Sequence, residues 1–312
     1  VASAKATGQV VRQDLAGKFV LITGTSSGFG RLTALECMRA GATVIATMRN
    51  LQGGRRAEAM ALITEAGKLN GKLHLVEIDI TDHDQVVSGI SAAEQIAGGA
   101  LDVVVNNAGI GIGGPIELAD IEAMQMTMDT NFFGALRIAR AALPAMRTRR
   151  QGLIINVSSQ LGRIIVPNMG IYGSTKFALE CASETMAYEL APHGVEVTII
   201  EPGGYPTNIW KSGVRNSESM LARQTKERLS AYDGLVAGAK AMGNRGGGST
   251  DPSDVSKAIV DVIALAPGSR PLRRPVHPDT RATDAINAVT TQVQAAVLGT
   301  GPYADWHKRV TS

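Results

Sequence analysis

The sequence predicts an α/β fold: a doubly wound, Rossmann-type arrangement in which a mostly parallel sheet of seven strands carries helices on both faces. Two observations support this class. From Gly17 onward, short runs rich in β-branched residues alternate with segments of helical periodicity, which is typical of βαβ units. A glycine-rich turn also lies between the first strand and the first helix, so the chain turns tightly at the carboxyl edge of the sheet.

The strand candidates are continuous apolar runs, as expected for a sheet that is buried on both faces. They are residues 18–23, 42–47, 72–79, 101–107, 152–159 and 195–202, with 270–278 as a final edge strand. Helical periodicity is clearest in residues 31–40, 133–147, 251–266 and 284–299. Right-handed crossovers between these strands give the doubly wound topology.

The order of elements indicates one domain, residues 17–312, preceded by an extension over residues 1–16. Regularity is lost in residues 204–250, which contain helical pieces and end in a run of glycines. A long insertion at the carboxyl edge of a parallel sheet is usually functional. We therefore expect residues 204–250 to form a substrate flap.

The composition is that of a soluble, core-forming chain: 44% of the 312 residues are hydrophobic, 19% are charged, and the net charge is +3. Lys and Arg are scattered, which argues against nucleic-acid binding. The sequence contains no run of roughly 18 apolar residues, so it predicts no membrane span. Residues 1–15 also lack the apolar centre of a signal peptide. Cys37 and Cys181 are not spaced like metal ligands, so we expect no metal site. We expect both thiols to be buried and the protein to be cytoplasmic.

The glycine turn reads "TGTSSGFG" and places Gly24, Gly28 and Gly30 between strand and helix. Glycine lets the backbone approach a pyrophosphate, which the amides at the start of the helix then bind. An ordinary tight turn is the alternative. A dinucleotide is the better interpretation because the turn lies on the first crossover, and the residues expected to contact it here are Gly24, Ser26, Ser27, Gly28, Phe29 and Gly30.

The second strand ends "TMRN", with Arg49 and no neighbouring carboxylate. An acid there would hold the ribose of NAD, whereas a guanidinium pairs with the 2′-phosphate of NADP. We therefore predict NADP(H) as cofactor, with NAD(H) less favoured, although a solvated Arg49 is the plain alternative. Asp79 is expected to accept from the adenine amino group with Ile80 packed nearby, but Asp79 or Asp82 can equally cap the next helix.

Several motifs now occur in an order that resembles the short-chain dehydrogenases/reductases, over roughly residues 17–266. They are "TGTSSGFG", "NNAG" (106–109), Asn131 in "DTNFFGALR", "INVSS" (155–159), "YGSTK" (172–176) and "PGGYPT" (202–207). Glycine spacing and length are similar to the compact type of this family. "SSGFG", the "TMR" strand end and "KFALE" are most similar to the branch that contains retinol and 17β-hydroxysteroid dehydrogenases.

Tyr172 and Lys176 stand one helical turn apart, and this spacing has a chemical purpose apart from the resemblance. A free phenol has a pKa of about 10, too high for an efficient base near neutrality. A neighbouring ammonium favours the phenolate, so we expect Lys176 to lower the pKa of Tyr172. A hydroxyl must also orient the substrate carbonyl; Ser159 is favoured by family spacing and Ser158 is the minor possibility.

The resemblance implies further roles. Lys176 and Tyr172 would also contact the nicotinamide ribose, and Asn131 would anchor a water that links Lys176 to solvent, unless its amide simply bonds a neighbouring carbonyl. Asn107, Ala108 and Gly109 would run beside the cofactor. Pro202 and Gly203 would let the backbone approach the nicotinamide carboxamide, with Thr207 as its donor. The resemblance also implies a homodimer or homotetramer.

Residues 110–118 and 160–171 are apolar and should lie over the nicotinamide, which favours an apolar or aromatic carbonyl or alcohol substrate. Ile165, Val166 and Met169 are alternatively core or interface residues, and Tyr205 and Trp210 are candidates for stacking on the substrate. The favoured function is an NADP(H)-dependent oxidoreductase that interconverts a ketone or aldehyde with an alcohol. An epimerase or lyase without net redox change, and a noncatalytic NADPH-sensing protein, are the alternatives.

Overall fold

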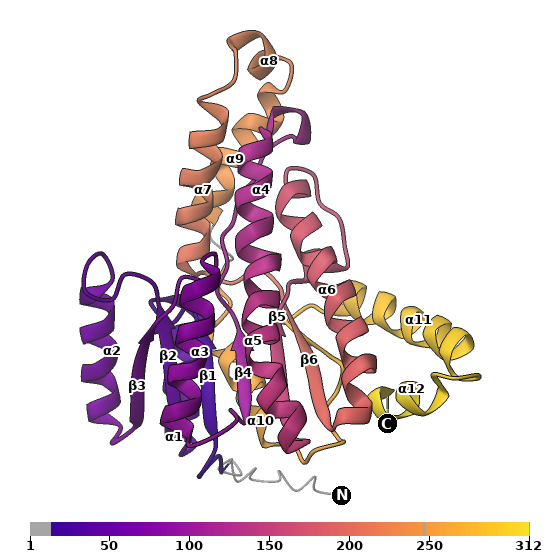
Figure 1. Ribbon diagram of the computed structural model, residues 1–312. Helices are drawn as coiled ribbons and strands as arrows, with labels where there is room; N and C mark the ends of the chain where they lie inside the picture. Colours follow the sequence, from indigo (N-terminus) through magenta and orange to yellow (C-terminus); the bar gives the residue numbers. More distant parts are fainter. Residues whose placement is uncertain (1–13, 246–247, 312) are drawn as a thin grey trace, which may run out of the picture.

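The computed structural model describes residues 14–245 and 248–311, and in this part of the chain seven strands form one sheet in the order β3-β2-β1-β4-β5-β6-β7 (Figure 1). Every neighbouring pair is parallel. The strands are β1 (Phe19–Thr23), β2 (Thr43–Met48), β3 (Lys72–Glu77), β4 (Val103–Asn106), β5 (Gly152–Val157), β6 (Val195–Pro202) and β7 (Arg273–Val276). The predicted α/β doubly wound fold is confirmed.

The central strands are buried on both faces because helices cover both. β4 pairs with β5 in a register that sets Val104 opposite Ile154 and Asn106 opposite Asn156. The predicted strand over residues 101–107 is shorter in the structure. At its start Asp102 accepts a hydrogen bond from the Phe19 amide, and at its end the chain turns toward the first glycine turn.

Helices flank the sheet in two layers, each with its own apolar core. On one face lie α1 (Gly28–Arg39), α2 (Arg56–Lys68) and α10 (Ser253–Ala264); on the other lie α3 (His83–Ala97), α5 (Gly134–Arg149) and α6 (Gly170–Leu190). The side chain of Asp82 caps α3 by accepting from the amides of Asp84 and Gln85. Asp82, and not Asp79, is therefore the helix cap.

The crossovers from β1 and β4 lead to opposite faces, so a crevice opens between the carboxyl ends of these strands. Above this edge stand α7 (Asn208–Leu221), α8 (Lys226–Ser230) and α9 (Asp233–Arg245) (Figure 1). Met220 and Leu221 of α7 join a third apolar cluster with Ile112, Leu118 and Ile171. The cluster also includes α4 (Ile121–Met128), which π-helix η2 (Asp129–Phe133) joins to α5. The insertion is thus packed onto the loops that leave the sheet.

The chain after β7 forms α11 (Arg281–Leu298) and α12 (Ala304–Thr311), beside α6 (Figure 1). Helix α12 has no counterpart among the elements predicted from the sequence. Of the expected extension, residues 1–13 lie outside the described residues, whereas Leu15 is buried and its amide donates to the Ala40 carbonyl.

Cys37 is buried as expected, but Cys181 is exposed, which corrects the prediction of two buried thiols. It lies on α6 and faces away from the sheet, because the residues buried on this helix include its neighbours Leu179, Glu180 and Ser183. No helix within the described residues has the length and apolar content needed to cross a membrane.

Candidate active site

A cavity of about 1160 Å³ opens at the carboxyl ends of the strands, between the glycine turn, the end of α6 that carries Tyr172 and the insertion helix α7. Most of the residues predicted to form the site line it. They are Gly24, Ser26, Ser27, Gly28, Phe29, Arg49, Asp79, Ile80, Asn107, Ala108, Gly109, Ser159, Tyr172, Lys176, Pro202, Gly203 and Thr207. Gly30 and Asn131 stand behind the cavity wall.

The glycines of the first turn are needed for two different reasons. Gly24 has φ +71°, and a Cβ there would lie 2.8 Å from the Ala108 Cα. Gly30 has no positive φ, but a Cβ would lie 2.5 Å from the Gly24 carbonyl oxygen and 2.4 Å from Nδ2 of Asn107. Gly30 therefore allows close packing and does not itself line the cavity.

The start of the "NNAG" segment is tied to this turn. The Thr23 hydroxyl oxygen accepts hydrogen bonds from the backbone amides of Asn107 and Ala108, each at 3.0 Å. The Asn107 side chain donates to the Thr23 carbonyl at 2.8 Å. The side chain of Asn107 thus fixes the shape of the turn, which leaves the backbone of residues 107–109 to form the wall.

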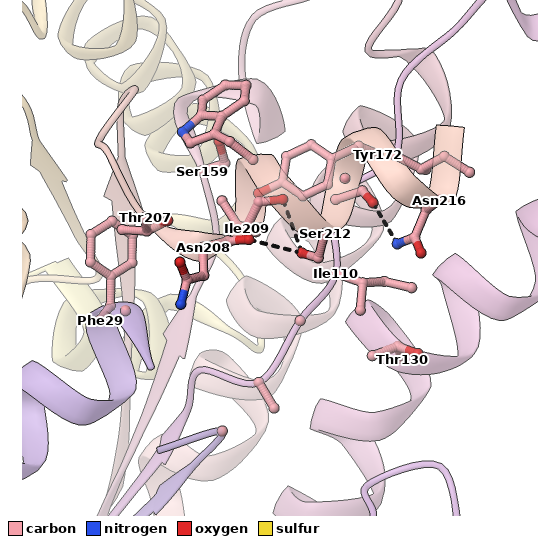
Figure 2. Close-up of a pocket in the computed structure, with 18 of the residues that line it drawn as sticks. Phe29, Ile110, Thr130, Ser159, Tyr172, Thr207, Asn208, Ile209, Ser212 and Asn216 are labelled. Carbon is pink, nitrogen blue, oxygen red and sulfur yellow. Dashed lines mark hydrogen bonds between the residues drawn. The ribbon is translucent and has the colours of Figure 1, made fainter. Parts of the chain in front are cut away.

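Two helix N-termini meet at one point of the cavity. Ser27 precedes α1 and Thr207 precedes α7, and neither side chain makes a capping hydrogen bond. Figure 2 shows Thr207 beside Phe29, and a Cβ on Gly28 would lie 3.6 Å from the Thr207 Cβ. Uncapped amides and the positive ends of two helix dipoles favour an anion at this position.

At the end of β2, the guanidinium of Arg49 is 3.8 Å from the Asp79 carboxylate, and its side chain is 63% exposed. The other carboxylate oxygen of Asp79 accepts from the backbone amide and the hydroxyl of Thr81. Ile80 is buried beside it. Arg55 lines the same region, although no sequence motif includes it. It is paired with Glu58 at 2.7 Å.

Tyr172 and Lys176 lie on the first turns of α6, both largely buried. The ammonium nitrogen of Lys176 donates to the Val157 carbonyl at 2.8 Å and lies 5.6 Å from the centre of the Tyr172 ring. Ser159 begins the short helix after β5, where its hydroxyl oxygen accepts from the Leu161 amide at 3.1 Å. The three side chains therefore meet on one wall of the cavity.

Burial raises the pKa of Tyr172 to about 12, and hydrogen bonding with Ser159 acts in the opposite direction. Burial also lowers the pKa of Lys176 to about 8, while the carboxylate of Glu180 raises it. The expected lowering of the Tyr172 pKa by Lys176 is not what the structure shows, because desolvation of the phenol outweighs the effect of its neighbours. Of the two serines, Ser159 is the one whose hydrogen bonding lowers the pKa of Tyr172.

Residues 18–219 match the short chain dehydrogenase family. The chain is 34% identical to 3-ketodihydrosphingosine reductase of Bacteroides thetaiotaomicron, over 84% of this chain and 88% of the relative. It is 37% identical to bovine (Bos taurus) retinol dehydrogenase 8, over 87% and 84%. A short-chain dehydrogenase structure from Streptomyces avermitilis superposes with a TM-score of 0.71 at 29% identity, over 93% of this chain and 97% of that one.

The chain belongs to the short-chain dehydrogenases/reductases. It is therefore an oxidoreductase that uses a nicotinamide cofactor and acts on a small molecule, with relatives in the retinol dehydrogenase branch. The family resemblance seen in the sequence motifs is confirmed.

Asn131 of this dehydrogenase/reductase lies in η2 and is buried. Its side-chain oxygen accepts from the Ile110 amide at 2.8 Å, and its nitrogen donates to the Ile110 carbonyl at 2.9 Å and to the Thr175 hydroxyl at 3.2 Å. The side chain thus clamps the loop after β4 against α6, as the plainer alternative for this residue anticipated. A π-helical turn is frequent at functional sites.

The substrate side of the cavity differs in part from the sequence prediction. Met169 lines it together with Leu161, Ile164 and Ile112, but Ile165 is 84% exposed and Val166 is also exposed, and neither lines the wall. Both follow Ile164 in the loop that leads to α6, where the chain turns outward.

Tyr205 and Trp210 both line the cavity, but the Tyr205 ring is buried between Phe29 and His277. Trp210 donates from its indole nitrogen to the Tyr205 carbonyl at 2.7 Å. Tyr205 is therefore a packing residue and does not present its ring for stacking on a substrate.

Helix α7, which lies within the predicted flap, contributes lining residues that carry no family motif and were not predicted individually. They include Asn208, Ile209, Ser212 and Asn216 (Figure 2). Asn216 donates to the Gly111 carbonyl at 2.9 Å, and the Gly113 amide donates to the Ser217 hydroxyl at 2.8 Å. These two hydrogen bonds fasten α7 over the loop after β4. Among the described residues, no cluster of three or more His, Cys, Asp or Glu side chains is arranged to hold a metal.

Proposed function

We propose that this protein is an NADP(H)-dependent oxidoreductase that interconverts a ketone or aldehyde with the corresponding secondary or primary alcohol. Tyr172 is the acid/base, Ser159 orients the carbonyl and Lys176 sets the charge of the site. One observation carries the proposal: these three side chains line the same cavity as the glycine turn at the start of α1. A proton donor and a nucleotide cradle thus lie in one enclosed space.

When bound, reduced nicotinamide would donate a hydride to the substrate carbon in reduction, and oxidised nicotinamide would accept one from it in oxidation. The protein supplies the proton. With a pKa raised to about 12 by burial, the Tyr172 phenol keeps its proton at neutral pH and can donate it to a carbonyl oxygen. Ser159 holds that oxygen through its hydroxyl, where negative charge develops during reduction. In the alcohol-oxidising direction the positive charges of Lys176 and of oxidised nicotinamide favour the phenolate.

The preference for NADP(H) rests on charge at the end of β2. The Arg49 side chain is exposed, and its contact with Asp79 at 3.8 Å is loose, so a 2′-phosphate can take its place with bidentate hydrogen bonds. Gly24 to Gly30 and the converging starts of α1 and α7 fit the pyrophosphate. Pro202, Gly203 and Thr207 then stand at the nicotinamide end.

The substrate side is lined by apolar residues, among them Ile112, Leu161, Ile164 and Met169. Such a wall favours an apolar or aromatic carbonyl compound over a short polar hydroxy acid. The names of the two curated relatives, a keto reductase and a retinol dehydrogenase, agree with carbonyl–alcohol chemistry. Helices α7 and α9, within residues 204–250, act as the flap that covers this half of the cavity; residues 246 and 247 lie outside the described residues.

A cytoplasmic homo-oligomer completes the proposal. Phe133, at the end of η2, and Phe177, on α6, are large apolar side chains that are exposed. Both lie in the helical segments that carry Asn131 and Tyr172. Exposed aromatic residues of this kind are enriched at protein–protein interfaces, which supports a dimer or tetramer formed through these helices.

A spectrophotometric screen at 340 nm tests the function. Purified protein is mixed with NADPH or NADH and with bulky apolar ketones, aldehydes and short polar keto acids. We expect oxidation of NADPH with the bulky ketones. Binding of NADPH without net absorbance change, accompanied by isomerisation or elimination of a substrate, would instead indicate an epimerase or lyase. Binding of NADPH without any turnover would indicate the noncatalytic alternative.

A further inference from the structure

A buried cluster of charged side chains lies directly behind the catalytic wall. Glu180 and Glu184 come from α6, Glu201 from β6 and Arg273 from β7. Arg273 donates to Glu180 at 2.9 Å and to Glu184 at 2.6 Å, and its Nε is 3.6 Å from Glu201. All four side chains are almost wholly removed from solvent. Burying charges costs free energy that even good pairing does not always repay, so the cluster calls for an explanation.

The C-terminal segment completes the cluster. Asn287 of α11 donates to Glu201 at 2.7 Å. Arg163, after the short helix that follows β5, donates to Asn287 and to Thr290 of α11 and lies 4.0 Å from Glu201. Strand β7 and helix α11, whose roles no family motif explains, are thus joined by polar contacts to the helix that carries Tyr172 and Lys176.

Glu180 is the member of the cluster that reaches the active site. It lies one helical turn beyond Lys176 on α6, on the same buried face. Its Oε1 atom and the hydroxyl of Ser158 are buried, and neither has a hydrogen-bond partner of normal geometry among the described residues. A Cβ on Gly162 would lie 2.9 Å from the Ser158 hydroxyl and 3.0 Å from Glu180 Cγ. The carboxylate therefore lies close behind the wall formed by Ser158 and Ser159.

The buried ammonium of Lys176 requires a counter-charge. Its side chain is buried, with the Val157 carbonyl as hydrogen-bond acceptor and the Tyr172 ring beside it. Asn131 faces the same part of α6 but bonds Ile110 and Thr175, and the two serines are neutral. Glu180 is the carboxylate that acts on the ammonium. A buried ammonium without a counter-charge loses its proton readily.

Arg273, which contacts Glu180 at 2.9 Å, favours the ionised form of this carboxylate. The three carboxylates of Glu180, Glu184 and Glu201 face two guanidinium groups, Arg163 and Arg273. Burial and the nearby Glu180 raise the pKa of Glu201 to about 8. Burial also raises the pKa of Glu180, while Arg273 and the Ser158 hydroxyl lower it.

We propose that Glu180, oriented by Arg273 of β7, is a positioning residue that keeps Lys176 cationic beside Tyr172. This role rests on the proposed function. In this role Glu180, the last residue of the "KFALE" segment, acts on the lysine of the same segment. Strand β7 then contributes to catalysis through Arg273, although none of its residues contacts the substrate.

The test compares Glu180→Gln with Glu184→Gln. Both variants remove a carboxylate that pairs with Arg273, so both report the structural cost of disturbing the cluster, but only the first stands one turn from Lys176. In the alcohol-oxidising direction, activity is lost at high pH as Lys176 deprotonates. We expect Glu180→Gln to shift this alkaline limb of kcat/KM downward by about 1 pH unit and Glu184→Gln to leave it in place. An unchanged limb in Glu180→Gln, or equal shifts in both variants, would overturn the proposal.

A second readout does not depend on turnover. NMR titration of lysine-labelled protein, with the Lys176 signal assigned from Lys176→Met, should show the same downward shift of the Lys176 pKa in Glu180→Gln. If the shift is present but no carbonyl compound is turned over, the proposed function fails while the coupling stands; if turnover is present and no shift occurs, the coupling fails alone.

Should Glu180→Gln be unfolded, Glu180→Met removes the same carboxylate while Arg273 keeps its contacts with Glu184 and Glu201. The same downward shift is then expected, and its absence would again overturn the proposal.

Discussion

The nucleotide side and the substrate side of the cavity are formed by different parts of the structure. The nucleotide side consists of backbone and small residues at the ends of β1 and β4, where Thr23 and Asn107 join the two strands by hydrogen bonds. The substrate side consists of side chains, among them those of α7, which Asn216 and Ser217 fasten to the loop after β4. The first side is part of the sheet, whereas the second is laid over it.

This difference explains where the chain tolerates change. On the nucleotide side a single added carbon meets backbone atoms at 2.5 Å, as at Gly30, and close-packed backbone has no means of relaxing. On the flap side, a few polar side chains join α7 to the loop after β4, and a substitution can remove one of these hydrogen bonds without removing the others. We expect substitutions to have large effects on catalysis and folding on the first side and graded effects on substrate affinity on the second.

The largest effect is expected at Tyr172, where the two sides meet. Tyr172→Phe removes the proton donor while keeping the ring, so kcat should fall by about 10³-fold, within the usual range for a lost general acid. NADPH affinity, measured by fluorescence titration, should change less than about twofold because the cradle is intact. Retained turnover would show that another group transfers the proton.

Gly30→Ala tests the packing of the nucleotide side. Its Cβ would lie 2.5 Å from the Gly24 carbonyl oxygen, and overpacking of this kind typically costs about 1–3 kcal/mol in the free energy of unfolding. Chemical denaturation measures it. Gly67→Ala, in helix α2 with no atom within 4 Å of the added carbon, is the matched control and should be neutral or stabilising by up to about 1 kcal/mol.

Arg49→Gln sharpens the cofactor assignment. Loss of the guanidinium should raise the KM for NADPH by about 10-fold, as expected when one charge-assisted pair to a phosphate is lost, and leave the KM for NADH unchanged. Arg56→Gln, an exposed arginine outside the cavity, should affect neither cofactor. Equal loss of affinity for both cofactors in Arg49→Gln would contradict a 2′-phosphate contact.

The smallest effect is expected on the flap. Asn216→Ala removes one hydrogen bond to the Gly111 carbonyl, worth about 1 kcal/mol, so the KM for an apolar ketone should rise about threefold to fivefold with NADPH affinity unchanged. Glu218→Ala, on the exposed side of the same helix, serves as control. A fall in kcat of the size expected for Tyr172→Phe would mean that α7 belongs to the catalytic side.

The same contrast sets how much of the molecule could be predicted from the sequence. Strands such as β4 and β5 can be predicted because burial on both faces requires continuous apolar runs. The glycine turn can be predicted because its backbone conformation requires glycine at position 24. The side-chain role of Asn107 could not be predicted, because its amide bonds a backbone carbonyl far along the chain. Tyr205 was misjudged because an aromatic residue in a loop gives no sign of whether Phe29 and His277 will enclose it.

The two outermost strands of the sheet have a consequence for the behaviour of the protein in concentrated solution. β7 carries exposed Arg274 and also Pro275, which lacks an amide hydrogen, and β3 exposes Lys72 and Glu77. Charged residues and proline on a sheet margin discourage strands of other molecules from adding to it. Self-association by extension of the sheet is thus disfavoured.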